Sequence, residues 1–446
     1  MSRTAVLAAL LALSGAAAAA GDLALPAPLG DADFPAHPMA EVELGQLLFW
    51  DAELSGNRNI ACATCHHPRF GTSDGLSLGM GEGGIGLGPQ RRVDPANAPE
   101  QRIPRNAPAL WNVGANGFTV MFADGRIERD PTRATGFRTP LEDEMVSGFA
   151  SLLSAQTMFP VLSPDEMAGH YHENEISALV RQGRITGPDG AWAGIAARIA
   201  AIPDYAQRFA AVYPEIAAGR QIGFTDISNA IAAYMTFDFR SDSAPFDAAL
   251  RGETPLEGAA QTGAELFYGK AGCGTCHSGP LLSDMQFHAM GDPQIGPGKS
   301  ERFEAHQRDI GRKRVSNRPE DAYAFRTPSL RNVTLTGPYG HAGAIADLRA
   351  YLRHHLSAGA GLQGYSVSQS VLPEMAVTKA DFAPGDEASN FAAIAAAGAA
   401  RSPMTLDEAE IDALMAFLAS LEDPVARQGG HMGIPATVPS GLPVEQ

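Results

Sequence analysis

The sequence predicts a mainly α-helical protein built from two similar domains, with extensive loops and little strand. Apolar residues recur at helical spacing in several segments, whereas the alternation of apolar and polar residues typical of strands is almost absent. The 48 glycines and 32 prolines among 446 residues indicate much irregular loop between the helices. A Cys-x-x-Cys-His motif occurs twice, each time after a short amphipathic stretch, and this weak internal repeat indicates two related halves.

The two motifs use all four cysteines of the chain. Two thiols at this spacing can form thioethers with the vinyl groups of a haem while the adjoining imidazole ligates its iron. A four-cysteine zinc site or structural disulfides would not require a histidine after each pair. The motifs therefore predict two cytochrome c-like haem domains with covalently bound c-type haems, attached through Cys62, Cys65 and His66 and through Cys273, Cys276 and His277.

The N-terminus has the pattern of a secretory signal peptide. Arg3 precedes an apolar run from Ala5 to Leu13, and small residues continue to Ala20, so cleavage is expected near Gly21. A membrane anchor is the alternative, but the run is shorter than the roughly 20 residues that a spanning helix needs. Because c-type haem attachment also belongs outside the cytoplasm, we expect a periplasmic protein with no membrane span.

The boundary between the halves is expected just after a helix at residues 225–239, for which Thr225 and Asp226 are candidate caps. The segment from Ser241 to Pro245 interrupts that helix. The predicted division is a signal peptide at residues 1–20, an N-terminal haem domain at 21–240, a C-terminal haem domain at 241–428 and an extended tail at 429–446.

Three further segments have a predicted local structure. Residues 405–408 have the pattern of a capping box that opens a helix, which Asp423-Pro424 ends. Residues 347–356 are predicted to form a helix, with two histidines near its end. The glycine-rich run at residues 79–88 is expected to be a flexible loop rather than a phosphate site, because no strand-loop-helix pattern surrounds it.

The formal net charge of −17 argues against nucleic acid and against anionic membrane surfaces as partners. This charge suits a basic electron carrier that docks near a haem edge. It equally suits the general solubility of a secreted protein.

The sixth ligand of each iron decides between two functions, since an occupied site moves electrons and a vacant one binds peroxide or oxygen. The loop between Pro68 and Arg105 contains no histidine, so only Met80 could ligate the first iron locally. A vacant first site and ligation by Met80 both stay open. For the second iron, either His354 or His355 could bind opposite the motif histidine, and histidine in place of methionine would lower the reduction potential.

Several separated blocks carry a family resemblance. They are Leu-Gly-Gln-Leu-Leu-Phe at residues 44–49 with Leu-Ser at 54–55, Arg-Asn-Ala-Pro at 105–108, Phe-Ala-Asp-Gly-Arg at 122–126, and Phe-Arg-Thr-Pro-Ser-Leu-Arg-Asn at 325–332 running into Thr-Gly-Pro-Tyr-Gly-His at 336–341. With the two haem motifs, these blocks make the chain resemble the bacterial di-haem cytochrome c peroxidase and MauG superfamily from about Leu44 to Leu421.

The resemblance implies an active site at the first haem and a calcium ion between the haems. Gln156 and Glu166 match the distal glutamine and glutamate of the family. A carboxylate above an open haem can move a proton between the two oxygens of peroxide, which is general acid–base catalysis. The calcium would be held by the Asn106 side chain and by the carbonyls of Thr336 and Pro338, which are oxygen ligands that suit this hard cation.

The chain departs from the family pattern at three positions. Peroxidases of the family carry a histidine that blocks the first iron until the second haem is reduced, and this sequence lacks it, as MauG does. The second-haem ligand, methionine in the peroxidases and tyrosine in MauG, falls on His355, so we predict His277 and His355 as the axial pair. The inter-haem tryptophan falls on Ala123, so Trp111 or Phe122 would have to replace it.

Together these features favour a periplasmic di-haem peroxidase-like oxidoreductase that reduces hydrogen peroxide at the first haem and receives electrons through the second. Its expected partners are hydrogen peroxide and a small electron-donor protein, either a cytochrome c or a cupredoxin, or an oxidisable protein substrate. Two alternatives stay open: a MauG-like enzyme that oxidises residues of a partner protein, and a non-catalytic di-haem electron-transfer cytochrome. Since members of the family are often dimers, a homodimer is a further expectation.

Overall fold

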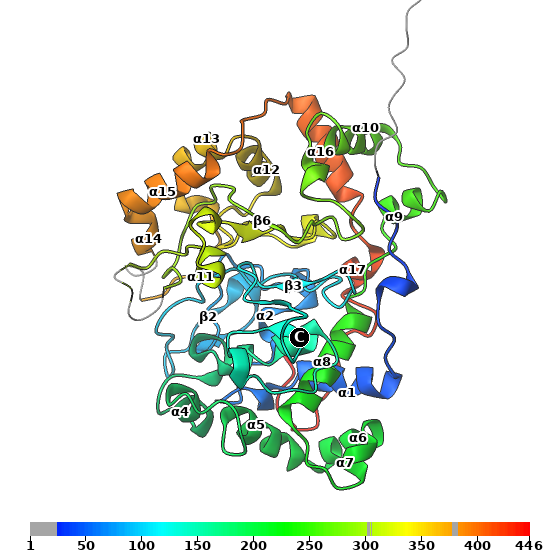
Figure 1. The fold of residues 1–446 in the computed structure, drawn as a ribbon, viewed down its shortest axis with the longest axis vertical. Coiled ribbons are helices and arrows are strands. Elements are labelled where there is room, and N and C mark those ends of the chain that lie inside the picture. The colour runs from blue at the N-terminus through cyan, green and yellow to red at the C-terminus, as the bar shows by residue number, and fades with distance from the viewer. Residues whose placement is uncertain (1–24, 301–303, 305, 377–381) are drawn as a thin grey trace, which may run out of the picture.

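The computed structural model describes residues 25–300, 304, 306–376 and 382–446, and helices dominate it (Figure 1). The predicted signal peptide at residues 1–20 lies outside the described residues. The described strands are two or three residues long and form small antiparallel sheets, which confirms the mainly α-helical prediction. The sheets pair β1 (Gly84–Ile85) with β2 (Arg92–Val93), β4 (Ile127–Arg129) with both β3 (Val120–Met121) and β5 (Phe137–Arg138), and β6 (Phe287–His288) with β7 (Phe325–Arg326).

The helices form two groups, with those of the N-terminal half in the lower part of Figure 1 and those of the C-terminal half mostly above. The N-terminal half contains α1 (Met39–Phe49), α2 (Cys62–Cys65), α3 (Leu152–Thr157), α4 (Glu175–Arg181), α5 (Ala191–Ala200), α6 (Pro203–Val212), α7 (Pro214–Ala217) and α8 (Phe224–Asp238). After it come α9 (Pro245–Leu250), α10 (Gly258–Tyr268), α11 (Lys313–Ser316), α12 (Leu348–Leu356), α13 (Ala358–Gln363), α14 (Ala383–Asp386), α15 (Ala388–Gly398), α16 (Glu408–Ala419) and α17 (Pro424–Gln428). The helices predicted at residues 225–239 and 347–356 correspond to α8 and α12.

Each half is built on one crossing pair of helices, and the two crossings match. In the first half α1 crosses α8, and a Cβ atom added to Gly45 would lie 1.8 Å from the Ala230 carbonyl oxygen. In the second half α10 crosses α16, and a Cβ atom on Gly263 would lie 1.9 Å from the Ala413 carbonyl oxygen. Only glycine allows helix backbones to approach this closely. The weak repeat in the sequence therefore corresponds to a repeated helix crossing ahead of each haem motif.

The hydrophobic residues form two main cores that follow this division. The first core contains Trp50, Trp192 and Phe239, and the second contains Phe246 and Phe417. The C-terminal end of the chain returns to the first half, as the label C in Figure 1 shows. Apolar side chains from residues 426–444 pack in the first core, so the last residues cover the N-terminal half rather than the half that precedes them in sequence.

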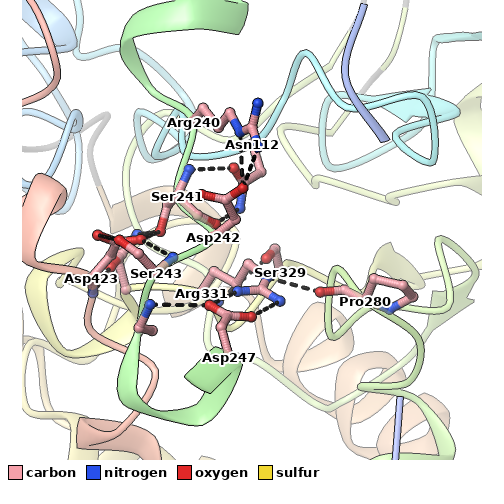
Figure 2. A network of polar contacts seen from close by, with 12 residues as sticks. Asn112, Arg240, Ser241, Asp242, Ser243, Asp247, Pro280, Ser329, Arg331 and Asp423 are labelled. Carbon is pink, nitrogen blue, oxygen red and sulfur yellow. Dashed lines mark hydrogen bonds and ion pairs between the residues drawn. The ribbon is translucent and has the colours of Figure 1, made fainter. Parts of the chain in front are cut away.

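Polar contacts fix the segment that joins the halves (Figure 2). The Asn112 amide exchanges two hydrogen bonds of 2.7 Å with the backbone of Ser241, whose hydroxyl donates to Asp423 at 3.1 Å. On the other side, Arg331 donates to both carboxylate oxygens of Asp247 at 2.8 and 2.9 Å, and this ion pair is almost completely buried. The linker is thus held by both halves.

The cap of α8 differs from the prediction. Gly223 occupies the N-cap position, and the Asp226 carboxylate accepts a hydrogen bond of 2.8 Å from the Gly223 N–H. Asp226 therefore accepts only the N–H of the N-cap residue, and Thr225 lies inside the first turn, so neither side chain is the N-cap of α8. Glycine is tolerated at an N-cap although it offers no side-chain acceptor.

The capping box predicted at residues 405–408 is also wrong by two residues. Asp407 is the N-cap of α16, its carboxylate accepts the Glu410 N–H at 2.9 Å, and Glu410 accepts the Asp407 N–H at 3.0 Å. Aspartate is among the strongest N-cap residues, so it displaces the threonine. Asp423-Pro424 does not simply end this helix, because Asp423 caps α17 and Pro424 occupies its first position, where proline is favourable.

Candidate active site

The first haem motif lies on the short helix α2, with both thiols outside any disulfide. His66 follows directly, and its Nδ1 atom lies 3.1 Å from the Thr72 carbonyl oxygen. A carbonyl can only accept, so Nδ1 donates and Nε2 is left for an iron. Thr72 has a φ of 66°, an uncommon conformation for a β-branched residue, which turns its carbonyl back towards the imidazole. Burial lowers the pKa of His66, which favours the neutral ligand form.

The second haem motif repeats this geometry. The Nδ1 atom of His277 lies 3.1 Å from the carbonyl oxygen of Leu282, which has a φ of 51°. Burial is the main cause that lowers the pKa of His277 to about 4, and the charge of His355 is the next. Cys273 and Cys276 are likewise outside any disulfide. Each motif therefore offers two free thiols and one neutral, oriented imidazole, which is the donor set that a c-type haem requires.

The two histidines at the end of α12 have different surroundings. His354 is buried, with Nε2 lying 3.2 Å from the Met290 carbonyl oxygen and 3.4 Å from Asp292. His355 instead lies close enough to His277 for its charge to affect the pKa of that residue. The structure thus gives the two histidines different surroundings, and ligation of the second iron by His355 stays a prediction.

Asp292 organises this side of the second haem, and the sequence offered no pattern that pointed to it. Its carboxylate accepts a hydrogen bond from the Tyr351 hydroxyl at 3.2 Å and lies 3.8 Å from His341. Burial by itself would raise the pKa of Asp292, but the neighbouring imidazoles of His341 and His354 hold it well below its usual range. The carboxylate therefore stays ionised and fixes the orientation of the residues around α12.

Glu166 lies in a π-helical turn, Pro164–Ala168. The N–H groups of Glu166, Met167 and Ala168 all converge on the carbonyl of Ser163, at 3.2, 3.0 and 2.9 Å. Single π-helical turns are frequent at functional sites. Burial raises the pKa of the Cys65 thiol in the first haem motif to about 12, and the charge of Glu166 is one of three carboxylate charges that add to this rise.

Two cations act on the half-buried Glu166 carboxylate. Burial raises the pKa of Glu166, and the charges of Arg126 and Lys299 oppose the rise. Arg126 comes from the first half, where it forms an ion pair of 3.1 Å with Asp124. Lys299 comes from the second half. Its pKa is lowered to about 8, mainly by burial and next by the charge of Arg126. The second half thus contributes to the surroundings of Glu166, through a lysine in a loop that has no sequence signal.

The other two residues considered for the first haem are Gln156 and Met80. Gln156 is half-buried at the end of α3, and its amide forms no hydrogen bond within the described residues. Met80 is fully buried in the glycine-rich loop. Gly81, the next residue, packs so tightly that an added Cβ atom would lie 1.9 Å from the Asp165 carbonyl oxygen. The loop that carries Met80 therefore contacts the segment that carries Glu166. The prediction of a flexible loop is wrong, because this contact anchors it.

The residues expected to hold calcium leave oxygen atoms available. The Asn106 amide nitrogen donates to the carbonyls of Leu76 and Ser77 at 2.7 and 3.2 Å, which leaves its Oδ1 atom free. In the part of the chain that the structure describes, the Thr336 and Pro338 carbonyls accept no hydrogen bond. Amide and carbonyl oxygens suit calcium, so the donor chemistry fits this cation.

At the position of the family's inter-haem tryptophan, the two halves make direct contact. The Arg326 N–H donates to the Ala123 carbonyl at 2.8 Å. The neighbouring Phe122 ring lies 3.6 Å below the Arg126 guanidinium. Trp111 lies elsewhere, with its indole N–H donating to the Gly71 carbonyl at 2.9 Å. Of the two aromatic residues considered as replacements, Phe122 is the one next to this contact.

Among the described residues, no helix has the length and apolar character needed to cross a membrane.

Comparison with known proteins finds relatives over most of the chain. A sequence profile of di-haem cytochrome c peroxidase matches residues 39–255. The chain is 31% identical over 332 residues to the methylamine utilization protein MauG of Methylorubrum extorquens, which covers 72% of each chain. It is 27% identical to the cytochrome c551 peroxidase of Pseudomonas aeruginosa, over 69% of each chain.

Solved structures show the same architecture. A MauG-like protein associated with microbial copper homeostasis is similar with a TM-score of 0.55 and 25% identity, covering 90% of this chain and 95% of that one. The diheme peroxidase BthA of Burkholderia thailandensis has the same fold, with a TM-score of 0.53, 20% identity and 88% coverage of both chains.

Proposed function

Because the chain belongs to the di-haem cytochrome c peroxidase and MauG family, we propose that it reduces hydrogen peroxide at its first haem with electrons that pass through its second. Membership of this family makes it an oxidoreductase with two c-type haems. The proposal rests on one observation, the asymmetry between the two motifs. The charge of His355 acts on His277 of the second motif, whereas the charge of the half-buried Glu166 carboxylate acts on Cys65 of the first.

Glu166 is proposed as the acid–base group. A haem iron with an open sixth position binds peroxide, and this is the chemistry that the first haem would supply. Glu166 would take the proton from one peroxide oxygen and return it to the other, which then leaves as water. A protonated Glu166, which its raised pKa favours, would make the second transfer, and the charges of Arg126 and Lys299, which oppose that rise, would favour the ionised form for the first. The Gln156 amide, which has no other partner among the described residues, would orient the peroxide.

The second haem is proposed as the electron input, with His277 and His355 as its axial ligands. The acidic chain favours a basic donor, so we propose a small cytochrome c or a cupredoxin as the partner. The N-terminal signal pattern supports a periplasmic location. A homodimer is proposed from the family resemblance alone.

Two features are proposed to connect the haems. Phe122 would replace the family's tryptophan, because the backbone beside it bonds directly to Arg326 of the second half. A calcium ion held by Asn106, Thr336 and Pro338 would fix the relative position of the two halves. Elemental analysis of the purified protein, before and after treatment with a calcium chelator, tests the metal.

Stopped-flow mixing of the fully ferric protein with hydrogen peroxide tests the main proposal. The reaction is expected without prior reduction, because the sequence has no histidine in the loop that would block the first iron. Low-temperature EPR of the same sample should show one high-spin and one low-spin haem. Two low-spin signals would instead identify a non-catalytic electron-transfer cytochrome.

MauG-like oxidation of a partner protein is the second candidate, favoured by the 31% identity to a MauG protein. The tyrosine ligand of MauG has no counterpart here, since Tyr351 lies one turn before His355 and donates its hydroxyl to Asp292. Sustained turnover with reduced cytochrome c would favour the peroxidase. Covalent change in a co-purified protein partner, detected by mass spectrometry, would favour the MauG-like reaction.

A further inference from the structure

Glu82, in the glycine-rich loop after the first haem motif, is a fully buried carboxylate with an unusual set of partners. Its Oε1 atom accepts three amide hydrogen bonds, from Asn57 at 2.8 Å, Asn59 at 2.8 Å and Asn97 at 2.6 Å. Its Oε2 atom has no hydrogen-bond partner, and Glu82 forms no ion pair with any described residue. Burying a carboxylate without a cation is costly, so this arrangement calls for a functional explanation.

The loop around Glu82 is bonded directly to the turn that carries Glu166. The Glu82 N–H donates to the Asp165 carbonyl at 2.9 Å, and the Gln101 amide donates to the Asp165 carboxylate at 2.8 Å. The close approach of Gly81 to the same carbonyl leaves no room for a side chain there. The position of Glu166 therefore depends on the position of this loop.

The asparagines that bind Glu82 extend the connection in two directions. Asn59 lies three residues before Cys62, so it joins the loop to the start of the haem attachment turn. Asn57 also donates to Glu173 at 2.6 Å and accepts from Asn174 at 2.8 Å. Asn174 in turn donates to the Ala168 carbonyl at 2.9 Å, at the end of the π-helical turn. Glu82 thus connects the haem motif with both ends of the turn that carries Glu166.

A buried arginine holds the rest of the loop. Arg91 donates to the carbonyls of Gly81, Gly84 and Gly86 at 2.7, 2.9 and 3.0 Å. These three carbonyls lie on a stretch whose glycines would otherwise allow many conformations. Glu82 and Arg91 together convert a glycine-rich segment into a fixed structure.

We propose that Glu82 is a positioning residue that keeps the open face of the first haem permanently in its reactive arrangement. By fixing the glycine-rich loop, it holds Glu166 in place and keeps Met80 from reaching the iron. This inference rests on the proposed function, because it explains how the ferric enzyme is ready for peroxide without a reductive rearrangement of the loop. The role requires an acceptor atom at Oε1 and does not require the charge.

Two substitutions separate the acceptor from the charge. Glu82→Gln keeps an oxygen for the three asparagines, so it should retain the high-spin EPR signal of the first haem and the ferric peroxide reaction. Glu82→Ala removes the acceptor, so part of the high-spin signal should become low-spin and the peroxide rate should fall about 100-fold, as expected for a displaced catalytic group. Hydrogen exchange measured by mass spectrometry should become faster in residues 79–97 of Glu82→Ala.

Asp51→Ala is the matched control, because Asp51 is another fully buried carboxylate of the first half, bonded to Tyr205 at 2.8 Å and Ser440 at 2.7 Å. It should lower the melting temperature without changing the spin state. If Glu82→Ala does not fold, Asn97→Ala removes one of the three donors and should produce the same changes to a smaller extent.

Unchanged spin state, exchange and rate in a folded Glu82→Ala or Asn97→Ala variant would overturn the inference, as would equal losses in Glu82→Gln and Glu82→Ala. A wild-type protein without a ferric high-spin signal would instead contradict the proposed function. The hydrogen-exchange comparison would still decide whether Glu82 fixes the loop.

Discussion

The two haem-binding halves begin alike and differ on the side opposite the motif histidine. In both, a glycine at a helix crossing precedes the motif, and the imidazole donates to a carbonyl of a residue with positive φ. In the second half, the regular helix α12 brings His355 near His277. In the first half, the π-helical turn carries Glu166, whose charge acts on Cys65 of the motif. The difference teaches that the two motifs share one attachment geometry, whereas segments remote from them give each its own surroundings, which on the proposed function determine whether the iron reacts.

The largest expected effect comes from removing the proposed sixth ligand of the second haem, which would leave that iron open like the first. His355→Ala should remove the low-spin EPR signal of the second haem completely, because no imidazole would then remain to complete its axial pair. His354→Ala is the matched control and should keep that signal, since His354 is bonded to Met290 and Asp292. Loss of the signal in His354→Ala alone would reverse the assignment.

Removing the acid–base group from the first half is the next test. Glu166→Gln should lower the rate of the ferric peroxide reaction by about 10²–10⁴-fold, the usual contribution of general acid–base catalysis. Asp165→Asn changes the neighbouring carboxylate, whose side chain bonds to Gln101, and should have a much smaller effect. Equal rates in Glu166→Gln and the unaltered protein would rule out this role for Glu166.

The linker is held by a buried ion pair on one side and by neutral hydrogen bonds on the other. This difference should appear in the free energy of unfolding. Arg331→Met leaves the buried Asp247 without its partner and should destabilise the protein by about 3–5 kcal/mol. Asn112→Ala breaks only neutral hydrogen bonds to Ser241 and should cost about 1–3 kcal/mol. Denaturant unfolding of both variants measures the two costs. A larger loss from Asn112→Ala would show that the first half provides the stronger anchor.

The smallest expected effect is a shift in the pH dependence of the peroxide rate. It tests whether a residue of the second half acts on the first haem site. The charge of Lys299 lowers the pKa of Glu166, so Lys299→Met should raise that pKa. If the carboxylate must accept the first proton, the peroxide rate falls as pH drops through this pKa, and the falling limb should move to higher pH in the variant. The exposed Lys270, paired with Glu410, offers a control in Lys270→Met, whose pH profile should be unchanged.

Much of the fold could be predicted from local patterns. The helices α8 and α12 and the low strand content follow from apolar spacing and composition, and the weak repeat around Gly45 and Gly263 corresponds to matched helix crossings. Caps were predicted less well, because several neighbouring polar residues can serve and packing selects among them. The glycine-rich loop was the clearest failure. Its composition favours flexibility, but Glu82 and Arg91 anchor it through residues on other segments.

The sequence by itself determined where the haems attach, since thioether formation and the first iron ligand need only five consecutive residues. It also narrowed the second ligand to two adjacent histidines. Only the tertiary structure showed that the two have different surroundings, because neighbours on a helix point in different directions and Asp292 lies beside His354. In the same way, the structure alone showed that Lys299 acts on Glu166. Electrostatic interactions depend on distance in space, and these residues are far apart in the chain.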